Sequence, residues 1–373
     1  MIAAQAPRRE PAECAIEIDR APLPTTLIKA LAEVTVTMSR SQATTGVLRF
    51  DTHRDERGEW IVQDSGHLAP WKPIAIPAHF GSHSEEVMRG FIKQIDVDYP
   101  ASMGAASVRV AVQDETLALD REHIRRVWAA TGSDGGTNGG SDGGTVSDGQ
   151  IVRELVSQTF VDVVADPGTS HTSLCQDATA AVFLRQRARA LGFELYARAG
   201  VLYFEQTALD GEPQPAIMVY AGSESNCAGL SIHYNGHMPD GVRVDRAAEV
   251  GHENTSSTFR SRLALLGSQS AESQKSSLKP FEWRMARPYG AGQAQVEAAA
   301  QATADRNAWK LIAEGELDGT RYGHVLLTHR TVEVDGVGST FGGRYYVDEV
   351  THTFSPAGYS QQFRLLRNAT GQS

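Results

Sequence analysis

The sequence is poor in cysteine: it has only Cys14, Cys175 and Cys227, and they lie far apart. An odd and scattered set does not make a disulfide framework, so we expect free thiols. Long apolar runs are lacking as well. A membrane helix needs a run of about 18 apolar residues, and every apolar run in this sequence is much shorter. The N-terminal stretch has arginines but no apolar core of secretory length. These absences predict a protein made in a cytoplasm, without a membrane span.

Positive charge is also scarce. The sequence has 35 Lys and Arg residues against 45 Asp and Glu, a net charge of −10. A general nucleic-acid binder presents a basic stripe that neutralises phosphates, so this balance disfavours that class. The hydrophobic content of 41% and charged content of 21% indicate a folded chain. Its 373 residues suit two or three domains.

Signatures of common catalytic chemistries are missing. The sequence has no G-x-x-x-x-G-K-[ST] phosphate loop and no G-x-S-x-G elbow, and the glycines within 336–343 precede a strand-like run rather than a helix. Ser231 and His233 share a face of a strand-like run, but no acid partner is identifiable. Asp96 and Asp98 also share a strand face, which we interpret as exposed and acidic. We therefore predict no catalytic residue and no cofactor.

Two histidine pairs have a spacing of four: His79 with His83, and His233 with His237. On a helix this spacing would place both imidazoles on one face, where they could bind zinc. Both contexts contain a helix breaker, Gly81 in the first and Gly236 in the second. We therefore predict no metal site and keep zinc as the minor alternative.

What the sequence does contain is a series of short β-prone runs separated by Pro, Gly and charged residues. In the first third of the chain we expect strands at residues 15–18, 34–38, 47–50, 60–62, 74–76, 91–97 and 108–112. Spacing of this kind predicts a small barrel or sandwich. Strand signals return later, at residues 217–220, 230–234, 242–245, 325–327 and 332–334.

A glycine-rich segment, residues 132–149, interrupts this pattern. It has eight glycines in eighteen positions and no aromatic residue, Lys or Arg. Such a composition buries too little apolar surface to offset its ordering entropy, so it predicts a flexible loop. Calcium binding is the alternative, but the segment lacks both the regularly spaced apolar residue of a β-roll repeat and the closing Glu of a helix-loop-helix site.

Helical periodicity follows the glycine-rich segment. Residues 151–160 carry an apolar stripe with Asp148 as the expected N-cap. A second helix is expected at about 177–191, ended by Gly192. Two short strands within 193–205 then predict a β-hairpin, so this region reads as a compact insert. An alanine-rich helix is expected at 293–314.

The stretch GGRYYVDEVTHTFSPAGYSQQFRLLRN, residues 342–368, predicts a second hairpin. Apolar and polar residues alternate with a period of two on both sides of a Ser-Pro-Ala-Gly turn. Aromatic residues gather on one face of the return strand.

Four segments together resemble the baseplate hub proteins of contractile phage tails and related contractile injection systems, often called late control protein D or tail protein D. GFI at 90–92 and DETLAL at 114–119 are similar to the family's G-x-I strand and closing D-x-x-x-x-L. Residues 178–206 are similar to its helix, glycine stop and tyrosine-containing hairpin, and the alanine-rich helix before a strand pair is the third element. The hairpin at 342–368 is similar to the family's G-x-Y-Y-V-x-x-V-x-H-x-F and G-Y terminus.

The resemblance covers most of the chain in the right order, but the glycine-rich segment departs from the family pattern. It implies a mainly β fold with an α+β insert: two tube-type β-barrel domains plus a small helix-hairpin domain. We divide the chain into an N-terminal tube barrel (1–130), the glycine-rich flexible loop (131–149), the insert (150–215), and a second tube barrel (216–373) that contains the helix at 293–314.

The resemblance also implies a function in shape rather than turnover. Such a hub is a homotrimer whose six barrels mimic sixfold symmetry, so that it joins a hexameric tail tube to a trimeric spike and leaves an axial channel. The implied partners are the spike, the tail tube or tube-initiator protein, the tape-measure protein and baseplate wedge proteins, with DNA only as passing cargo. The implied location is the virion tail baseplate, assembled in the bacterial host cytoplasm. No spike or lysozyme domain is fused here, so we expect a separate chain to supply the piercing tip.

The resemblance assigns nine residues to the barrel wall or to a subunit or tube interface: Phe91, Ile92, Tyr345, Tyr346, Val350, His352, Phe354, Tyr359 and Phe363. The negative net charge leads us to expect an acidic channel that repels DNA. The alternative function is a tail-associated peptidoglycan or glycan hydrolase that would use Asp96, Asp98 or Glu349. A receptor-binding adhesin is a third possibility, which would need exposed aromatic patches.

Overall fold

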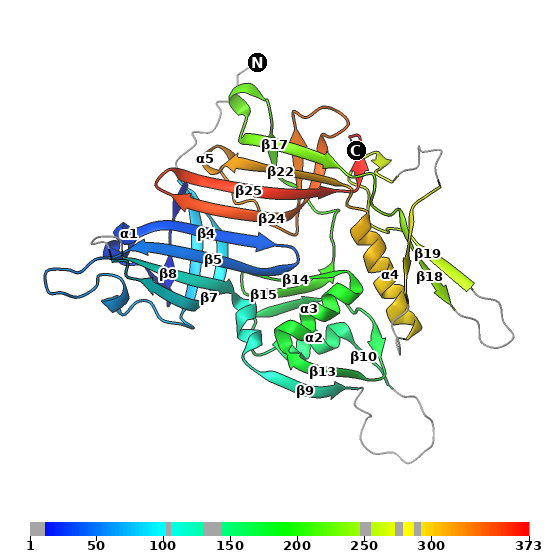
Figure 1. Cartoon of the computed structure of the whole chain (residues 1–373), viewed down its shortest axis with the longest axis horizontal. Helices are drawn as coiled ribbons and strands as arrows, with labels where there is room; N and C mark the ends of the chain where they lie inside the picture. The colour runs from blue at the N-terminus through cyan, green and yellow to red at the C-terminus, as the bar shows by residue number, and fades with distance from the viewer. Residues whose placement is uncertain are drawn as a thin grey trace, which may run out of the picture.

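The computed structural model describes residues 12–101, 106–129, 144–246, 255–272, 279–286 and 292–372. Strands dominate this part of the chain, and Figure 1 shows many of them side by side in one broad sheet. The mainly β fold class with an α+β insert, expected from the sequence, is confirmed. The described residues fall into four parts: a first β half, an insert, a second β half and a side unit.

The first β half comprises residues 12–120. Its elements are β1 (Ala12–Cys14), β2 (Glu17–Ile18), β3 (Ala21–Pro22), α1 (Thr25–Ala30), β4 (Leu31–Ser39), β5 (Gln42–Asp51), β6 (Pro73–Phe80), β7 (His83–Asp98) and β8 (Ser107–Asp114). Strand β4 shows why they form: Val34, Val36 and Met38 are buried, whereas the residues between them are partly exposed. Their side chains belong to one apolar core with those of β5 to β8.

Gly90 of the GFI motif is fixed by strand pairing. It lies opposite Asp114 in the β7–β8 ladder. A Cβ atom at this position would lie 1.9 Å from the Gln113 carbonyl oxygen, closer than any real contact. The motif therefore needs glycine because two backbones approach each other there.

The second β half comprises residues 214–235 and 311–372. Its elements are β16 (Gln214–Met218), β17 (Cys227–Tyr234), β22 (Leu311–Asp318), α5 (Gly319–Tyr322), β23 (Thr331–Asp335), β24 (Gly343–Ser355), β25 (Gly358–Arg367) and the short β26 (Ala369–Thr370). The expected hairpin is confirmed as β24 and β25, which turn at Pro356 and Ala357. A separate apolar core lies between β16, β22, β23, β24 and β25.

One hydrogen-bonded sheet of 14 strands runs through both β halves in the order β17-β22-β25-β24-β4-β5-β8-β7-β6-β2-β3, with β1, β16 and β23 attached to it. The halves meet where β24 pairs antiparallel with β4, so that Phe354 lies opposite Val34 and Thr351 opposite Thr37. The hydroxyl oxygens of Thr37 and Thr351 are 3.2 Å apart across this seam. Two segments more than 300 residues apart in sequence thus form one continuous wall.

The insert comprises residues 123–206 and lies below the sheet in Figure 1. Its elements are β9 (His123–Trp128), β10 (Val146–Ser147), α2 (Asp148–Val156), β11 (Asp162–Ala165), β12 (Ser170–His171), β13 (Leu174–Thr179), α3 (Ala180–Leu191), β14 (Phe193–Arg198) and β15 (Val201–Gln206). Both helices pack their apolar faces against the β11-β15-β14 sheet in one core. As expected, α3 ends at Gly192, which has the left-handed φ of 72°.

Strand β9 precedes the predicted domain boundary at residue 130, yet it pairs with β13. Trp128 at its end is buried in the core of the insert and donates its indole N–H to Gln176 over 2.9 Å. We therefore propose that the insert begins before β9. The other boundaries, at residues 149 and 215, stay predictions.

The side unit contains β18 (Gly241–Arg246), β19 (Thr255–Phe259), β21 (Glu282–Met285) and α4 (Gln293–Asn307). The short β20 (Gln269–Ser270) pairs instead with β26 of the second β half. Helix α4 covers Val242 and Val244 of β18 with Val296, Ala300 and Ala304. It also approaches α3, because a Cβ at Gly192 would lie 2.9 Å from the Cβ of Ala302.

Two helix predictions need correction near their ends. The alanine-rich helix ends at Asn307, and residues 311–314 belong to β22 instead. β22 pairs with both β17 and β25, and this ladder outweighs the helical preference that the alanine-rich composition indicated. The second helix begins at Ala180 because residues 174–179 pair with β9.

Two predicted strands are irregular. Residues 325–327 lie in a loop because their amides bond to side chains: Val325 donates to Glu85, Leu326 to Gln361 and Leu327 to Gln214. Residues 60–62 form one isolated bridge and a turn, although Val62 is fully buried. In both cases the apolar pattern predicted burial correctly and backbone pairing wrongly.

The end of the glycine-rich segment is ordered, contrary to the flexible loop expected there. Residues 146–147 form β10, and Ser147, not Asp148, caps α2 by exchanging hydrogen bonds with Gln150. Asp148 is instead buried in the first turn, where it pairs with Arg187 at 2.7 Å. Residues 130–143 lie outside the described ranges.

Candidate functional site

The nine residues that the resemblance assigned to a wall or interface all lie in the 14-stranded sheet, on β7, β24 and β25. All except Phe91 are buried within the single chain. They divide among different cores: Phe354 and Tyr359 join the core of the first β half, whereas Tyr345, Val350 and Phe363 join that of the second. The β24–β25 hairpin therefore fills both halves. Its assignment to wall or interface stays a prediction.

The hairpin tip reaches the first β half through stacked aromatic rings. Phe354 and Tyr359 stack at 4.1 Å between centroids, and Tyr359 lies 6.1 Å from Phe80 of β6. The Tyr359 hydroxyl is 2.8 Å from His352 Nδ1. His352 Nε2 has no hydrogen-bond partner within the described ranges. Burial lowers the pKa of His352 to about 3.

Because His352 is buried in its neutral form, we expect the free energy of unfolding to fall as the pH is lowered. The unfolded chain binds a proton at His352 below about pH 6.5, whereas the folded chain resists it down to about pH 3. Stability from this group is therefore complete above pH 6.5 and is lost as the pH falls, at up to about 1.4 kcal/mol per pH unit. Urea unfolding of wild type and His352→Gln between pH 7.5 and 4.5 measures it.

We expect the stability gap between His352→Gln and wild type to shrink as the pH falls. The buried His329, whose pKa burial also lowers, is common to both proteins and cancels in the comparison. A gap that stays constant over this pH range would contradict the account.

Three parts of the chain meet around the buried carboxylate of Glu194, on β14. Its Oε2 accepts a hydrogen bond from the Tyr346 hydroxyl at 2.5 Å, and its Oε1 accepts one from Thr207 at 3.0 Å. Arg40, in the turn between β4 and β5, lies 3.5 Å from Oε1 and also binds Asp348 at 3.0 Å. Burial raises the pKa of Glu194 in spite of Arg40. The cluster links the insert to both β halves.

A cavity of about 390 Å³ also lies where the insert meets the β halves. It is bounded by β7, the β14–β15 turn and residues 324–330. Its wall includes His329, whose ring stacks on Tyr196 at 3.8 Å and whose nitrogens have no hydrogen-bond partner in the described part of the chain. Arg198 also lines it and donates to the Thr328 carbonyl at 2.8 Å. The cavity thus has a mainly apolar wall where the insert meets the β halves, with His329 and Arg198 among its polar groups.

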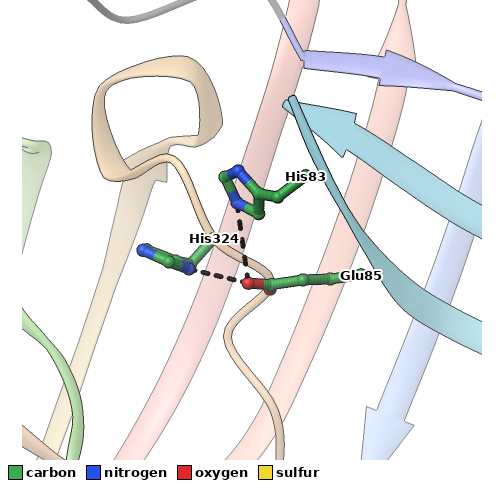
Figure 2. A group of neighbouring side chains, drawn as sticks. All are labelled: His83, Glu85 and His324. Carbon is green, nitrogen blue, oxygen red and sulfur yellow. Dashed lines mark hydrogen bonds and ion pairs between the residues drawn. The ribbon is translucent and has the colours of Figure 1, made fainter. Parts of the chain in front are cut away.

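Two residues that line this cavity, Glu85 and His324, come together with His83 as three potential metal ligands (Figure 2). His83 and Glu85 begin β7, and His324 follows α5. The Nδ1 of His324 lies 2.7 Å from Glu85 Oε1, and the Nε2 of His83 lies 3.8 Å from the same oxygen. The structure thus groups His83 with residues that the spacing of four with His79 did not indicate.

The residues considered for hydrolysis are not brought into one site. Asp96 lies opposite Arg109 in the β7–β8 ladder and accepts a hydrogen bond from Gln94. Asp98 lies opposite Ser107. Glu349 lies on β24 opposite Arg364. Both residues line an open groove together with Glu314 and Glu316.

The Ser231 and His233 pair is on the exposed edge strand β17, where Ser231 donates weakly to the Glu314 carbonyl at 3.4 Å. Sequence reasoning missed Glu85, Glu194 and His324. One signal was available: His83 and Glu85 are two apart, the spacing that places side chains on one face of a strand.

No protein-family profile and no curated protein matches the chain. Among solved structures, the 43 kDa tail protein of prophage MuSo2 from Shewanella oneidensis has a TM-score of 0.67 at 12% identity, over 96% of this chain and 99% of that one. A tail protein from Neisseria meningitidis MC58 has a TM-score of 0.65 at 12% identity, over 96% and 97%.

A third similar structure is the E. coli c3393 protein, described as a component of the type VI secretion system with structural similarity to the T4 bacteriophage tail proteins gp27 and gp5. Its TM-score is 0.54 at 12% identity, over 94% of this chain and 76% of that one. The tail-protein resemblance seen in the sequence is therefore confirmed at the level of the fold. At this identity the likeness concerns the fold alone.

Proposed function

We propose that this chain is the structural hub of a contractile tail baseplate, a homotrimer that joins a hexameric tail tube to a trimeric spike around an axial channel. The observation that carries the proposal is the near end-to-end likeness to two tail proteins, which spans both β halves and the insert. A local fold match would not include all these parts in one arrangement.

The sheet itself supports a ring-forming role. Each β half has its own apolar core, and the β4–β24 pairing joins the halves in one sheet. If each β half is one wall unit, a trimer places six wall units around one axis. Such a ring can match a sixfold partner on one side and a threefold partner on the other. The Glu194 cluster then holds the insert at a fixed angle to that wall.

Spike and tube proteins are the partners that we propose first. One similar structure is a Francisella PdpA-VgrG complex, and c3393 is described as similar to gp27 and gp5. The tape-measure and wedge proteins, DNA as passing cargo and the baseplate location follow from the hub role. We propose no catalytic turnover, because Asp96, Asp98 and Glu349 lie opposite different neighbours rather than around one cleft.

The proposal predicts a defined native mass. Light scattering of the purified chain, alone and with the spike protein encoded beside it, should give a threefold multiple of 40.3 kDa for this component. The spike supplies further contact surface, so the trimer is expected to be more stable in its presence. A monomer that ignores the spike at micromolar concentration would contradict the proposal.

A further inference from the structure

His83, Glu85 and His324 form a ligand set of the kind that transition metals prefer. Two imidazole nitrogens and one carboxylate oxygen suit Zn²⁺ and related ions, whereas Mg²⁺ and Ca²⁺ prefer oxygen ligands alone. The three candidate ligand atoms lie within 4.8 Å of one another. They come from segments about 240 residues apart, so no local pattern explains their meeting.

The separations fit an ion between the side chains. Metal–ligand distances of about 2.1 Å in a tetrahedron place two ligand atoms about 3.4 Å apart. The distances from Glu85 Oε1 to the two imidazoles, 2.7 Å and 3.8 Å, lie on either side of that value. Small side-chain rotations would therefore be enough.

Neighbouring groups already orient the three ligands. The second oxygen of Glu85 accepts the Val325 amide at 2.6 Å, which leaves Oε1 facing both imidazoles (Figure 2). The His83 ring stacks on Phe80 at 5.1 Å, and the His324 ring lies edge-on to Tyr322 at 6.1 Å. A ligand carboxylate that is itself hydrogen-bonded, as Glu85 is, is typical of known metal sites.

The site is also open to solvent. The side chains of His83, Glu85 and His324 are 45%, 31% and 41% exposed, so an ion can enter and a water molecule can complete its coordination. Without an ion, His83 donates from Nε2 to the Gly323 carbonyl at 3.0 Å. Metal binding at Nε2 would replace this bond and leave the ring proton of His83 on Nδ1.

We propose that His83, Glu85 and His324 bind one divalent transition-metal ion of the Zn²⁺ class, which clamps the β6–β7 turn to the loop between α5 and β23. The ion would bridge the first and second β halves at a point away from the β4–β24 seam. Because the ligands meet only in the folded chain, binding would stabilise the fold. The inference stands independently of the hub role.

Isothermal titration of the untagged, chelator-treated full chain with ZnCl₂, and separately with MgCl₂, tests the proposal. We expect one Zn²⁺ per chain and no Mg²⁺ binding. His83→Ala and His324→Ala should each weaken Zn²⁺ binding at least about tenfold. His123→Ala is the matched control: His123 is an exposed histidine in the insert, 2.8 Å from Asp177, and its loss should leave binding unchanged.

Circular dichroism checks that each variant is folded, and the Co²⁺ absorption spectrum of the wild type reports nitrogen and oxygen ligands without any substitution. Absence of Zn²⁺ binding to the wild type would overturn the proposal. Binding that survives both His83→Ala and His324→Ala would overturn it as well, as would equal weakening by His123→Ala.

Discussion

Replacement of Glu194 by alanine is expected to lower the free energy of unfolding by about 3–5 kcal/mol. Glu194 is only 4% exposed, and its carboxylate accepts hydrogen bonds from Tyr346 and Thr207, with Arg40 at 3.5 Å. Its removal leaves the buried Tyr346 hydroxyl without its acceptor. Arg40 then keeps Asp348 as its close anionic partner. Urea unfolding at fixed protein concentration measures the loss.

Two further variants sharpen this test. Burial raises the pKa of Glu194, so the neutral Glu194→Gln should be tolerated better than alanine because it keeps an acceptor for Tyr346. Glu205→Ala is the matched control, since Glu205 lies directly opposite Glu194 in the β14–β15 hairpin but is only partly buried. Equal losses for Glu194→Ala and Glu205→Ala would show that the cluster does not hold the three parts together.

Arg367→Ala is expected to cost about 3–5 kcal/mol as well. Arg367 ends β25 and is fully buried. It donates to three carbonyl oxygens, of Leu266 at 3.0 Å, Phe341 at 2.9 Å and Gly371 at 2.6 Å. The guanidinium carbon also lies 5.1 Å from the ring centroid of Tyr345. Its removal would take the guanidinium donor from all three carbonyls, of which Phe341 keeps the Tyr345 hydroxyl at 2.7 Å, and would leave a cavity beside the terminal hairpin.

Lysine cannot replace this arginine, because one ammonium lacks the planar fork that reaches three segments. We expect Arg367→Lys to recover less than half of the loss in urea unfolding. Arg364 on the same strand is the control: it is exposed and lies 3.8 Å from Glu314 and Asp348, so Arg364→Ala should change stability by about 0.5 kcal/mol or less. A smaller effect at Arg367 than at Arg364 would refute the role assigned to it.

Local signals predicted much of this fold. The period of two within 342–368 and the glycine that ends α3 depend on neighbouring residues, and the structure contains both features. Two of the misread segments make their hydrogen bonds with residues far away in sequence. Residues 311–314 became a strand because β17 and β25 flank them, and residues 325–327 stayed irregular because Glu85, Gln361 and Gln214 take their amides.

The candidate sites were harder to predict for the same reason. Glu194 and Tyr346 are 152 positions apart, and Glu85 and His324 are 239 apart. Neither pair leaves a trace in local periodicity. The His79 and His83 spacing pointed to one residue of the metal candidate for a helical reason that does not apply, since the two lie on opposite sides of the β6–β7 turn.

The central claim is the threefold ring, and electron cryomicroscopy of the chain assembled with its spike tests it most directly. The account predicts three copies around one axis, with six β halves forming the wall of an open channel and the spike on that axis. A single copy per spike, a ring of any other number, or a wall built from the insert instead of the β halves would contradict it.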